Sequence, residues 1–260
     1  MDTTHGPWPG RFVWHDLMTK DAEAAQTFYS ALLGWKIESH DKAGFVYRRI
    51  LCGPGSIGGI IEEPTIPHAH WMPYLAVADV DRAAERVKAL GGSVCVPPTD
   101  IPMTGRFAVV GDPAGGTFCV YTGLPGNHGA NPDEAVPGRA CWNELYSVDL
   151  DASQAFFTAL AGWQPEPHDA GAMGAYHVEM LGKKQTGGML RQPMPATPSI
   201  WVVYFYVLDL AVSTARAEEL GATAMMRAMP IPDVGTFSML SDPTGALFAL
   251  FEPVPGGSPC

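Results

Sequence analysis

The sequence lacks several features that mark common functional classes. Its longest apolar run, IWVVYFYVL at 200–208, stops at Asp209 and is far too short to span a bilayer. The opening residues, MDTTHGPWPGRF, have neither the basic nor the apolar region of a signal peptide, so we expect a cytoplasmic protein. There is no G-x-S-x-G elbow, no phosphate-binding loop and no dinucleotide fingerprint. The sequence therefore predicts neither a membrane protein nor one of these common enzyme classes.

Cysteine and basic residues are also scarce. The cysteines are odd in number and contain no C-x-x-C pair, which is typical of reduced thiols and leaves no zinc site of the usual spacing. The five are Cys52, Cys95, Cys119, Cys141 and Cys260. With 16 basic against 27 acidic residues the formal net charge is −11, which argues against nucleic acid or an anionic membrane as a partner. The 47% of hydrophobic residues are enough to form a folded core.

The chain carries an internal duplication. Residues 10–35, GRFVWHDLMTKDAEAAQTFYSALLGW, align without gaps with residues 138–163, GRACWNELYSVDLDASQAFFTALAGW, and 12 of the 26 positions are identical. Residues 70–92 and 105–121 align in the same way with 200–222 and 235–251. A stretch rich in Gly, Pro and Asn separates the copies. We therefore predict a first domain at 1–122, a linker at 123–137 and a second domain at 138–260.

Each half repeats a smaller unit. A strand ends at Asp21, which caps the helix AEAAQTFYSALLG, and shorter strands follow at 45–51 and 57–62. The order then restarts at MPYLAVAD and runs to the turn D-P-x-G, where Pro presets one φ angle and Gly supplies a positive one. The pattern predicts four modules of one strand, one helix and three strands.

This arrangement resembles the vicinal oxygen chelate superfamily, which holds glyoxalase I, extradiol dioxygenases and bleomycin resistance proteins. The W-x-[DE]-L opening and the I-P-x-x-G-x-F segment are most similar to two-domain, glyoxalase-like actinobacterial proteins often called hydroxylases. The resemblance implies an α+β fold of two tandem glyoxalase-like domains. Each domain would consist of two βαβββ modules forming a curved mixed sheet, or cup.

The resemblance also implies a metal, but the residues at the usual ligand positions do not suit one. The usual His stands seven residues before each helix-capping Asp, and the usual Glu seven residues after the Asp of D-P-x-G. None of these positions holds His, Glu, Gln or Asp, and a metal site needs several converging donors. The positions hold Trp14, Trp142, Met72, Val202, Cys119 and Ala249. We therefore expect no metal or other cofactor at the family's usual place.

Strand alternation predicts what lines each cup instead. The concave sheet face, here called the inner face, carries one acid and several aromatic residues in each half. Removal of water from a carboxylate among aromatic rings raises its pKa, so Glu144 is the first candidate for general acid or base, and Asp16 the second. The ligand-binding candidates are Trp14, Met72, Tyr74, Cys119, Tyr121, Trp142, Tyr146, Tyr204, Tyr206 and Phe251.

Three functions remain open on this evidence. The first is a glyoxalase-like protein that binds or converts a hydrophobic or aromatic metabolite, since apolar walls with few polar anchors are typical of ligand pockets. The second is a non-catalytic sequestering or antibiotic-resistance protein. The third is a metal-dependent lyase or dioxygenase. It is equally consistent with the sequence that the aromatic side chains simply fill the cups as hydrophobic core. We expect the protein to be a monomer or a homodimer.

Overall fold

The computed structural model describes residues 8–42, 45–169, 175–194 and 197–257. The first half contains β1 (Phe12–Thr19), α1 (Ala22–Leu33), β2 (Lys36–Lys42), β3 (Phe45–Cys52), β4 (Gly55–Glu62), β5 (His70–Ala76), α2 (Val80–Ala89), β6 (Ser93–Ile101), β7 (Gly105–Gly111) and β8 (Thr117–Gly123). The second half contains β9 (Ala140–Ser147), α3 (Leu150–Ala161), β10 (Gln164–Asp169), β11 (Ala175–Leu181), β12 (Lys184–Arg191), β13 (Ile200–Tyr206), α4 (Leu210–Glu219), β14 (Thr223–Ile231), β15 (Gly235–Ser241) and β16 (Leu247–Pro253). None of these helices has the length and apolar character that a bilayer crossing requires.

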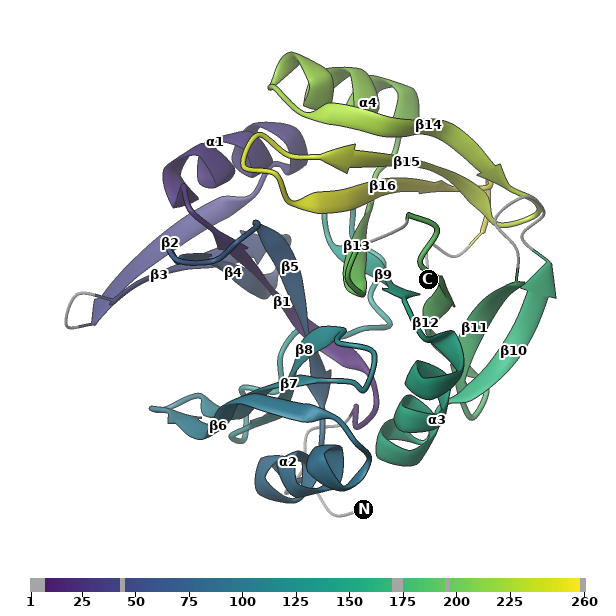
Figure 1. The fold of residues 1–260 in the computed structure, drawn as a ribbon. Helices are drawn as coiled ribbons and strands as arrows, with labels where there is room; N and C mark the ends of the chain where they lie inside the picture. Colours follow the sequence, from purple (N-terminus) through teal and green to yellow (C-terminus); the bar gives the residue numbers. More distant parts are fainter. Residues whose placement is uncertain (1–7, 43–44, 170–174, 195–196, 258–260) are drawn as a thin grey trace. The chain divides into compact units, whose positions relative to one another are not determined.

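The strand–helix–three-strand module occurs four times, as predicted. The strands form two eight-stranded mixed sheets, ordered β2-β3-β4-β1-β5-β8-β7-β6 and β10-β11-β12-β9-β13-β16-β15-β14. Within a module the first and last strands pair in parallel and the others antiparallel, as β5 with β8 and β7 with β8. The helix lies on one face of its module, as α4 does over β14–β16 in Figure 1. The fold is therefore α+β, with the four βαβββ modules that the resemblance implies.

The helix ends follow from local sequence. The side chain of Asp21 accepts a hydrogen bond from the amide of Ala24, and the equivalent aspartates cap the other three helices in the same way. α1 ends at Gly34 and α3 at Gly162, both in the left-handed conformation that glycine adopts without strain. The repeated Asp and Gly of the alignment are thus helix boundaries.

Packing divides the chain into two compact units that regroup the four modules. One unit holds 73–132 and 143–201 with the segment up to Trp14, and therefore contains the second and third modules. The other holds 15–72, 133–142 and 202–260, and contains the first and fourth. The residues that interact within a unit thus come from both halves of the sequence.

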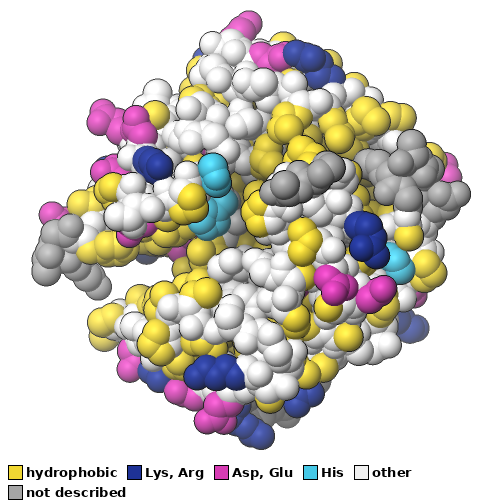
Figure 2. All heavy atoms as spheres, in the orientation of Figure 1, with side chains coloured by type: hydrophobic (Ala, Val, Ile, Leu, Met, Phe, Trp, Pro, Cys, Tyr) yellow, Lys and Arg dark blue, Asp and Glu magenta, His cyan; other side chains and the backbone are white. Residues whose placement is uncertain are grey.

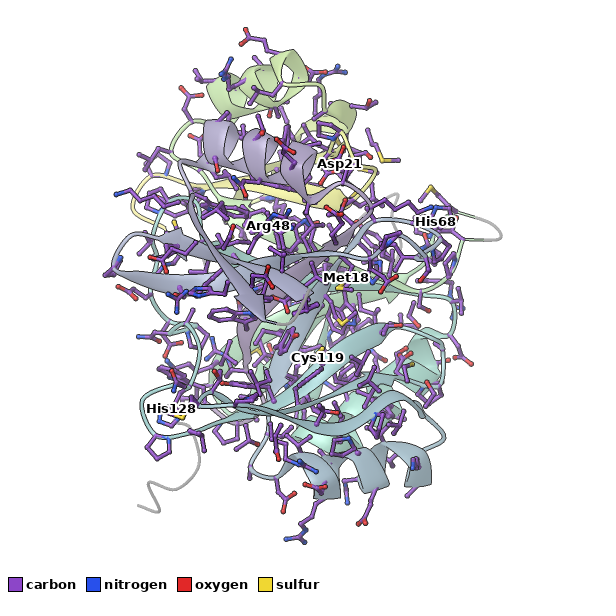
Figure 3. The ribbon with its side chains drawn as sticks, turned by 90° about the vertical axis from the view of Figure 1, so that its left-hand side faces the viewer. Met18, Asp21, Arg48, His68, Cys119 and His128 are labelled. Carbon is purple, nitrogen blue, oxygen red and sulfur yellow. The ribbon has the colours of Figure 1, made fainter. Side chains whose placement is uncertain are left out.

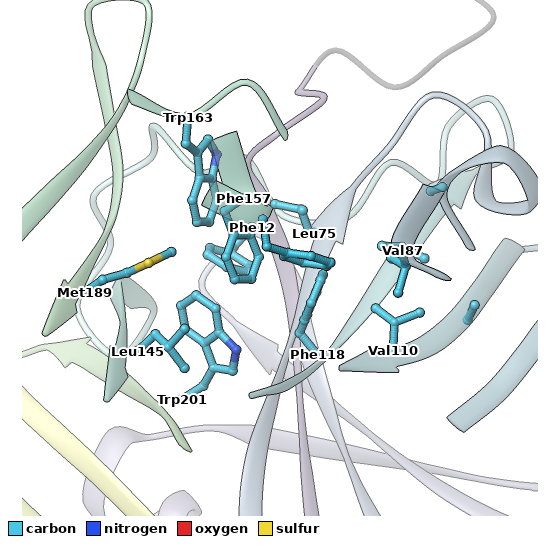
Figure 4. Packing of buried hydrophobic residues seen from close by; sticks show 14 of the residues in the cluster. Phe12, Leu75, Val87, Val110, Phe118, Leu145, Phe157, Trp163, Met189 and Trp201 are labelled. Atoms are coloured by element: carbon cyan, nitrogen blue, oxygen red, sulfur yellow. The ribbon is translucent and has the colours of Figure 1, made fainter. Parts of the chain in front are cut away.

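The core of the first of these units is aromatic (Figure 4). Phe157 on α3 stacks on Trp163 at a ring distance of 4.9 Å, and Phe12 meets Trp201 edge to face at 5.1 Å. Phe118 of β8 packs against the same helix at 5.1 Å from Phe157. Buried aromatic pairs of this kind stabilise a fold by about 0.5–1.5 kcal/mol each beyond their burial.

The duplicated Gly and Trp of the alignment meet each other across the repeats. Trp35, which follows α1, donates its indole N–H to the carbonyl of Gly138 at 2.8 Å. Trp163, which follows α3, donates to the carbonyl of Gly10 at 2.8 Å. Each tryptophan thereby anchors the start of the other repeat, which gives both residues a structural reason to recur.

The D-P-x-G turns also connect modules within each unit. Asp112 accepts hydrogen bonds from the amide of Gly116 at 2.6 Å and from the hydroxyl of Ser153 on α3. Asp242 accepts from the hydroxyl of Tyr29 on α1 at 3.0 Å. Each aspartate therefore shapes its own turn and holds the helix of a module from the other half.

Candidate functional site

The inner face of the first module carries a polar group of residues in two rows. Residues paired across a sheet lie on the same face, so the strand register defines each row. One row contains Asp16, Gly59, Arg49 and Glu38, and the next contains Met18, Ile61, Tyr47 and His40. Leu17 and Ile60 point to the opposite, helix-bearing face and are fully buried there.

A hydrogen bond joins the two rows. The hydroxyl of Tyr47 donates to Oδ1 of Asp16 at 2.8 Å. The tyrosine ring lies over Gly59, where an added Cβ would stand 2.2 Å from the Tyr47 hydroxyl. Asp16, the acceptor, is only 2% exposed. Gly59 is needed for this buried contact because any larger residue there would occupy the space of the tyrosine ring.

Arg49 lies in the same row and pairs with Glu38 on the neighbouring strand. Its Nη2 donates to Glu38 Oε2, and this contact lowers the pKa of the Glu38 carboxyl below its usual value. The Nε2 atom of His40 is 3.9 Å from the same oxygen. The row thus holds one arginine and two acids, and the arginine is paired with the outer acid, Glu38.

The third module repeats the arrangement on its own inner face. One row contains Glu144, Gly188, Val178 and Glu166, and the next contains Tyr146, Leu190, Tyr176 and His168. Five residue types therefore recur at equivalent positions of the two modules: the inner acid, the glycine, the outer glutamate, the tyrosine and the histidine. The most marked difference between the repeats is that Val178 replaces Arg49.

The second and fourth modules carry a repeated aromatic group instead. In the second, Tyr74 is 6.2 Å from Tyr121 and 6.5 Å from Phe107, measured between ring centroids. In the fourth, Tyr204 is 5.6 Å from Phe237, which pairs in register with Phe251. The aromatic residues predicted for these faces are thus present and mostly buried.

Tyr121 has a structural role as well. Its hydroxyl donates to the carbonyl of Asn127 at 2.6 Å, and burial raises its pKa to about 12. Its ring and that of Phe251 lie over Gly105 and Gly235, where an added Cβ would come within 3.0 Å and 2.5 Å of them. The same glycine-under-ring arrangement therefore recurs in both modules.

The other predicted site residues lie on these inner faces, some in one unit and some in the other. Cys119 is buried and paired in register with Tyr74, while Met72 on β5 is buried. Tyr146 is buried beside Glu144, and Tyr206 is half-buried opposite Phe251. Trp14 and Trp142 are half-buried on β1 and β9. Asp16 and Glu144 belong to different units.

Sequence reasoning missed Tyr47, Arg49 and Tyr176. The strands that contain them, FVYRRIL and AYHVEML, align at an offset of one residue from the better-matched repeat, and only the tyrosine is identical. A comparison of these two strands alone would have found the tyrosine. Its pairing with the acid depends on strand register, which the sequence does not give.

Two cavities among the described residues lie outside the acid-bearing rows. A groove of about 370 Å³ is lined by residues of α1 with Leu220 and Pro243. It lies beside Asp21, which Figure 3 shows at the start of α1, apart from Met18 on the strand below. A much smaller cavity is lined by Trp8, Tyr121 and His128, among others. Neither includes an acid of the inner-face rows.

The metal that the family resemblance implies does not fit the donors present. Within the described ranges, no group of three or more His, Cys, Asp or Glu side chains is arranged to hold a metal ion. Asp16 accepts a hydrogen bond from the Tyr47 hydroxyl, and Cys119 pairs in register with Tyr74 and Val109. Transition metals need several nitrogen, oxygen or sulfur donors at one point, so we assign no chemical step to a metal.

Basic side chains do not form a continuous patch on the face shown in Figure 2. The Lys and Arg residues visible there lie at several places, mostly along the rim of the view.

Comparison with known proteins agrees with the fold. Residues 11–120 match the model of the Glyoxalase/Bleomycin resistance protein/Dioxygenase superfamily, and residues 144–251 match a glyoxalase-like domain. CFP32 of Mycobacterium tuberculosis, which has a provisional glyoxylase name, is 33% identical over 93% of this chain and 94% of its own. The anthracycline biosynthesis protein DnrV of Streptomyces peucetius is 30% identical over 94% of each chain.

Solved structures show the same architecture. The 2,3-dioxygenase LapB from Pseudomonas sp. KL28 superimposes with a TM-score of 0.68 at 16% identity, covering 96% of this chain and 93% of LapB. The Mn(II)-bound glyoxalase from Novosphingobium aromaticivorans gives 0.67 at 18% identity, covering 94% and 82%. At this identity the likeness concerns the fold alone. Together with the two relatives above, these matches show that the chain belongs to the glyoxalase/bleomycin resistance protein/dioxygenase superfamily, with two copies of its domain.

Proposed function

We propose that this protein binds a hydrophobic, aromatic small molecule on its inner faces and converts it by proton transfer, without a metal at the family's usual ligand positions. The observation that carries the proposal is the hydrogen bond between Tyr47 and Asp16, two residues along β1 from Trp14, which stands where the family usually has a metal ligand. The recurrence of acid, glycine and tyrosine in the third module supports it.

The acid–tyrosine pair can move a proton without a metal. A tyrosine hydroxyl can donate one hydrogen bond, which here goes to Asp16, and can accept another, which in this proposal comes from a ligand hydroxyl. As the ligand proton passes to the Tyr47 oxygen, the tyrosine proton passes to Asp16. The ligand then carries an anionic oxygen and Asp16 a neutral carboxyl group, so charge is conserved.

Aromatic residues would supply most of the binding energy. Planar ligands gain from stacked or edge-to-face contacts with rings such as those of Tyr204 and Phe237. The similarity to a protein named for anthracycline biosynthesis supports an aromatic substrate. With a net charge of −11, nucleic acid and anionic membranes remain unfavoured partners, and we propose a monomer or homodimer.

A second function, sequestration without turnover, is favoured by one observation. Asp16 and Arg49 already have partners inside the protein, so the first-module face could serve as a fixed wall rather than a reacting group. Substitution distinguishes the two functions. In Glu144→Gln and Asp16→Asn, a catalyst keeps ligand affinity within about threefold and loses turnover by about 100-fold or more, the scale of general acid–base catalysis.

The test begins with binding. The protein is titrated with 2-naphthol and other neutral aromatic alcohols, and tryptophan fluorescence reports occupancy. Saturable binding that is weakened by Tyr204→Ala supports the proposal. The absence of saturable binding to every probe of this class would contradict both the catalytic and the sequestering form.

A further inference from the structure

The groove beside α1 lies on the helix-bearing side of the unit that contains the first and fourth modules. Phe28, Leu220 and Pro243 line it with apolar surface, and Ala24 contributes only a methyl group. Its volume of about 370 Å³ is near the lower end of the range for ligand pockets, and it is open to solvent rather than enclosed. This shape suits a few side chains of another protein better than a small molecule that must be surrounded.

The equivalent helix pair in the other unit shows how such a gap can be bridged. There the Nε and Nη2 atoms of Arg86 on α2 donate to the carbonyl of Ala159 on α3 at 2.9 and 2.7 Å. The aligned residue Arg216 on α4 donates instead to Glu219 of its own helix at 3.1 Å. An arginine stem can cover apolar surface while its charged end stays hydrated. The chain thus bridges one helix pair with its own arginine and leaves the other without this one.

The packing at the corner below the helices also differs. A Cβ added to Gly92 would lie 3.0 Å from a ring carbon of Phe156 on α3, closer than two carbon atoms normally approach. Ala222 aligns with Gly92 and Phe28 with Phe156, so the unit with the groove has this methyl group at its corner. The change favours a wider separation of α1 from the corner, which accounts for a groove at this place.

The charge at the groove selects the kind of partner. Asp21 and Glu23 are exposed at its rim, and no base is among the described residues that line it. The two acids outweigh the partial positive charge of about half a unit at the start of a helix. Lys20 precedes them on the chain but does not line the groove. A second copy of this chain, with its own net charge of −11, would be repelled, whereas a basic partner would be attracted.

We propose that this groove docks a short segment of another protein in which apolar side chains flank a lysine or arginine. The apolar side chains would pack against Phe28, Leu220 and Pro243, and the cation would lie beside Glu23. The inference is independent of the proposed function, because the groove contains no residue of the inner faces.

Two-dimensional NMR of isotope-labelled protein tests the proposal and locates the site. The probe is the peptide acetyl-Leu-Arg-Leu-amide, compared with peptides that carry citrulline, the neutral isostere of arginine, or glutamate at the centre. We expect saturable shifts of the amide signals of α1 and Leu220 with the arginine peptide. The citrulline peptide should bind about threefold more weakly, the scale of an exposed ion pair, and the glutamate peptide more weakly still.

Matched substitutions in the two units separate the groove from general charge effects. Glu23→Lys should weaken binding of the arginine peptide by about fivefold, because it replaces an attraction with a repulsion. Asp151→Lys makes the same charge change at the aligned position of α3 and should alter the affinity by less than about twofold. Ala24→Leu would occupy the groove and should also cost about fivefold, whereas Ala152→Leu on α3 should not.

The inference is overturned if the arginine peptide gives no saturable shifts, if the glutamate peptide binds equally well, or if Asp151→Lys loses as much affinity as Glu23→Lys. Equal binding of the citrulline peptide would indicate a purely apolar partner. Shifts of the same signals with protein concentration alone would indicate a second copy, and both results also contradict the proposal. The same spectra show whether each variant is folded, and if Ala24→Leu is not, the two charge variants decide.

Discussion

The Tyr47 hydroxyl reaches Asp16 by crossing the bare backbone of Gly59, and this contact links three adjacent strands on the inner face. A donor and an acceptor from β3 and β1 meet because the residue between them on β4 has no side chain. The arrangement explains how Asp16 can be buried without a metal, because the Tyr47 hydroxyl supplies it with a hydrogen bond.

Substitution of Gly59 tests that geometry. In Gly59→Ala the new methyl group would lie 2.2 Å from the tyrosine hydroxyl, so the ring must move and the bond to Asp16 must break. We expect a loss of about 1–3 kcal/mol in the free energy of unfolding, measured by urea denaturation. In a Tyr47→Ala background the same substitution should cost much less. An equal cost in both backgrounds would show that the tyrosine is not the group displaced.

The reciprocal tryptophan bonds predict matched losses of stability. Trp35→Phe and Trp163→Phe keep an aromatic ring but leave the carbonyls of Gly138 and Gly10 without their indole donor. Each should lower the free energy of unfolding by about 1–3 kcal/mol, from the lost bond and the smaller ring. The exposed residue Phe45 offers a control, because Phe45→Leu should change stability by less than about 0.5 kcal/mol.

Glu179 predicts a pH-dependent stability. This side chain is 0% exposed, and burial raises its pKa from 4.5 to about 7 although the neighbouring Gln154 amide lowers it in part. The folded state holds the proton of Glu179 more tightly than the unfolded chain does. The stabilisation that this gives to the folded state is therefore fully present below about pH 4.5. It is lost as the pH rises toward and through 7.

The aligned residue in the first half is the core residue Ile50. Glu179→Ile should therefore raise the free energy of unfolding at pH 8 by about 1–3 kcal/mol and change it little at pH 4, as measured by denaturant titration. An equal effect at both pH values would contradict the raised pKa. Glu166→Gln, at an exposed glutamate on the neighbouring strand, provides the control for loss of a carboxylate alone.

Much of the fold could be predicted from the sequence because the patterns that determine it are local. The aspartate caps, the glycines that end α1 and α3, and the D-P-x-G turns each act through residues close in sequence. The duplicated segment was also visible, but its identical residues have different roles. Trp35 and Trp163 anchor one copy to the glycine of the other, whereas Asp16 contacts a tyrosine.

The site residues Tyr47 and Arg49 could not be found in this way. Their role depends on which residues of β3, β4 and β1 stand opposite one another, and a shift of one position would turn each to the other face. The grouping of modules into units likewise depends on long-range contacts such as Tyr29 with Asp242, which no local pattern signals.

The central claim is that an aromatic ligand binds without a metal. The most direct measurement is the affinity for 2-naphthol of tag-free protein before and after EDTA treatment, with metal content followed by elemental mass spectrometry. We predict unchanged affinity, and less than about a tenth of an equivalent of metal, even after exposure to zinc, nickel, iron or manganese. A stoichiometric metal, with binding lost on chelation and restored by that metal, would contradict the account.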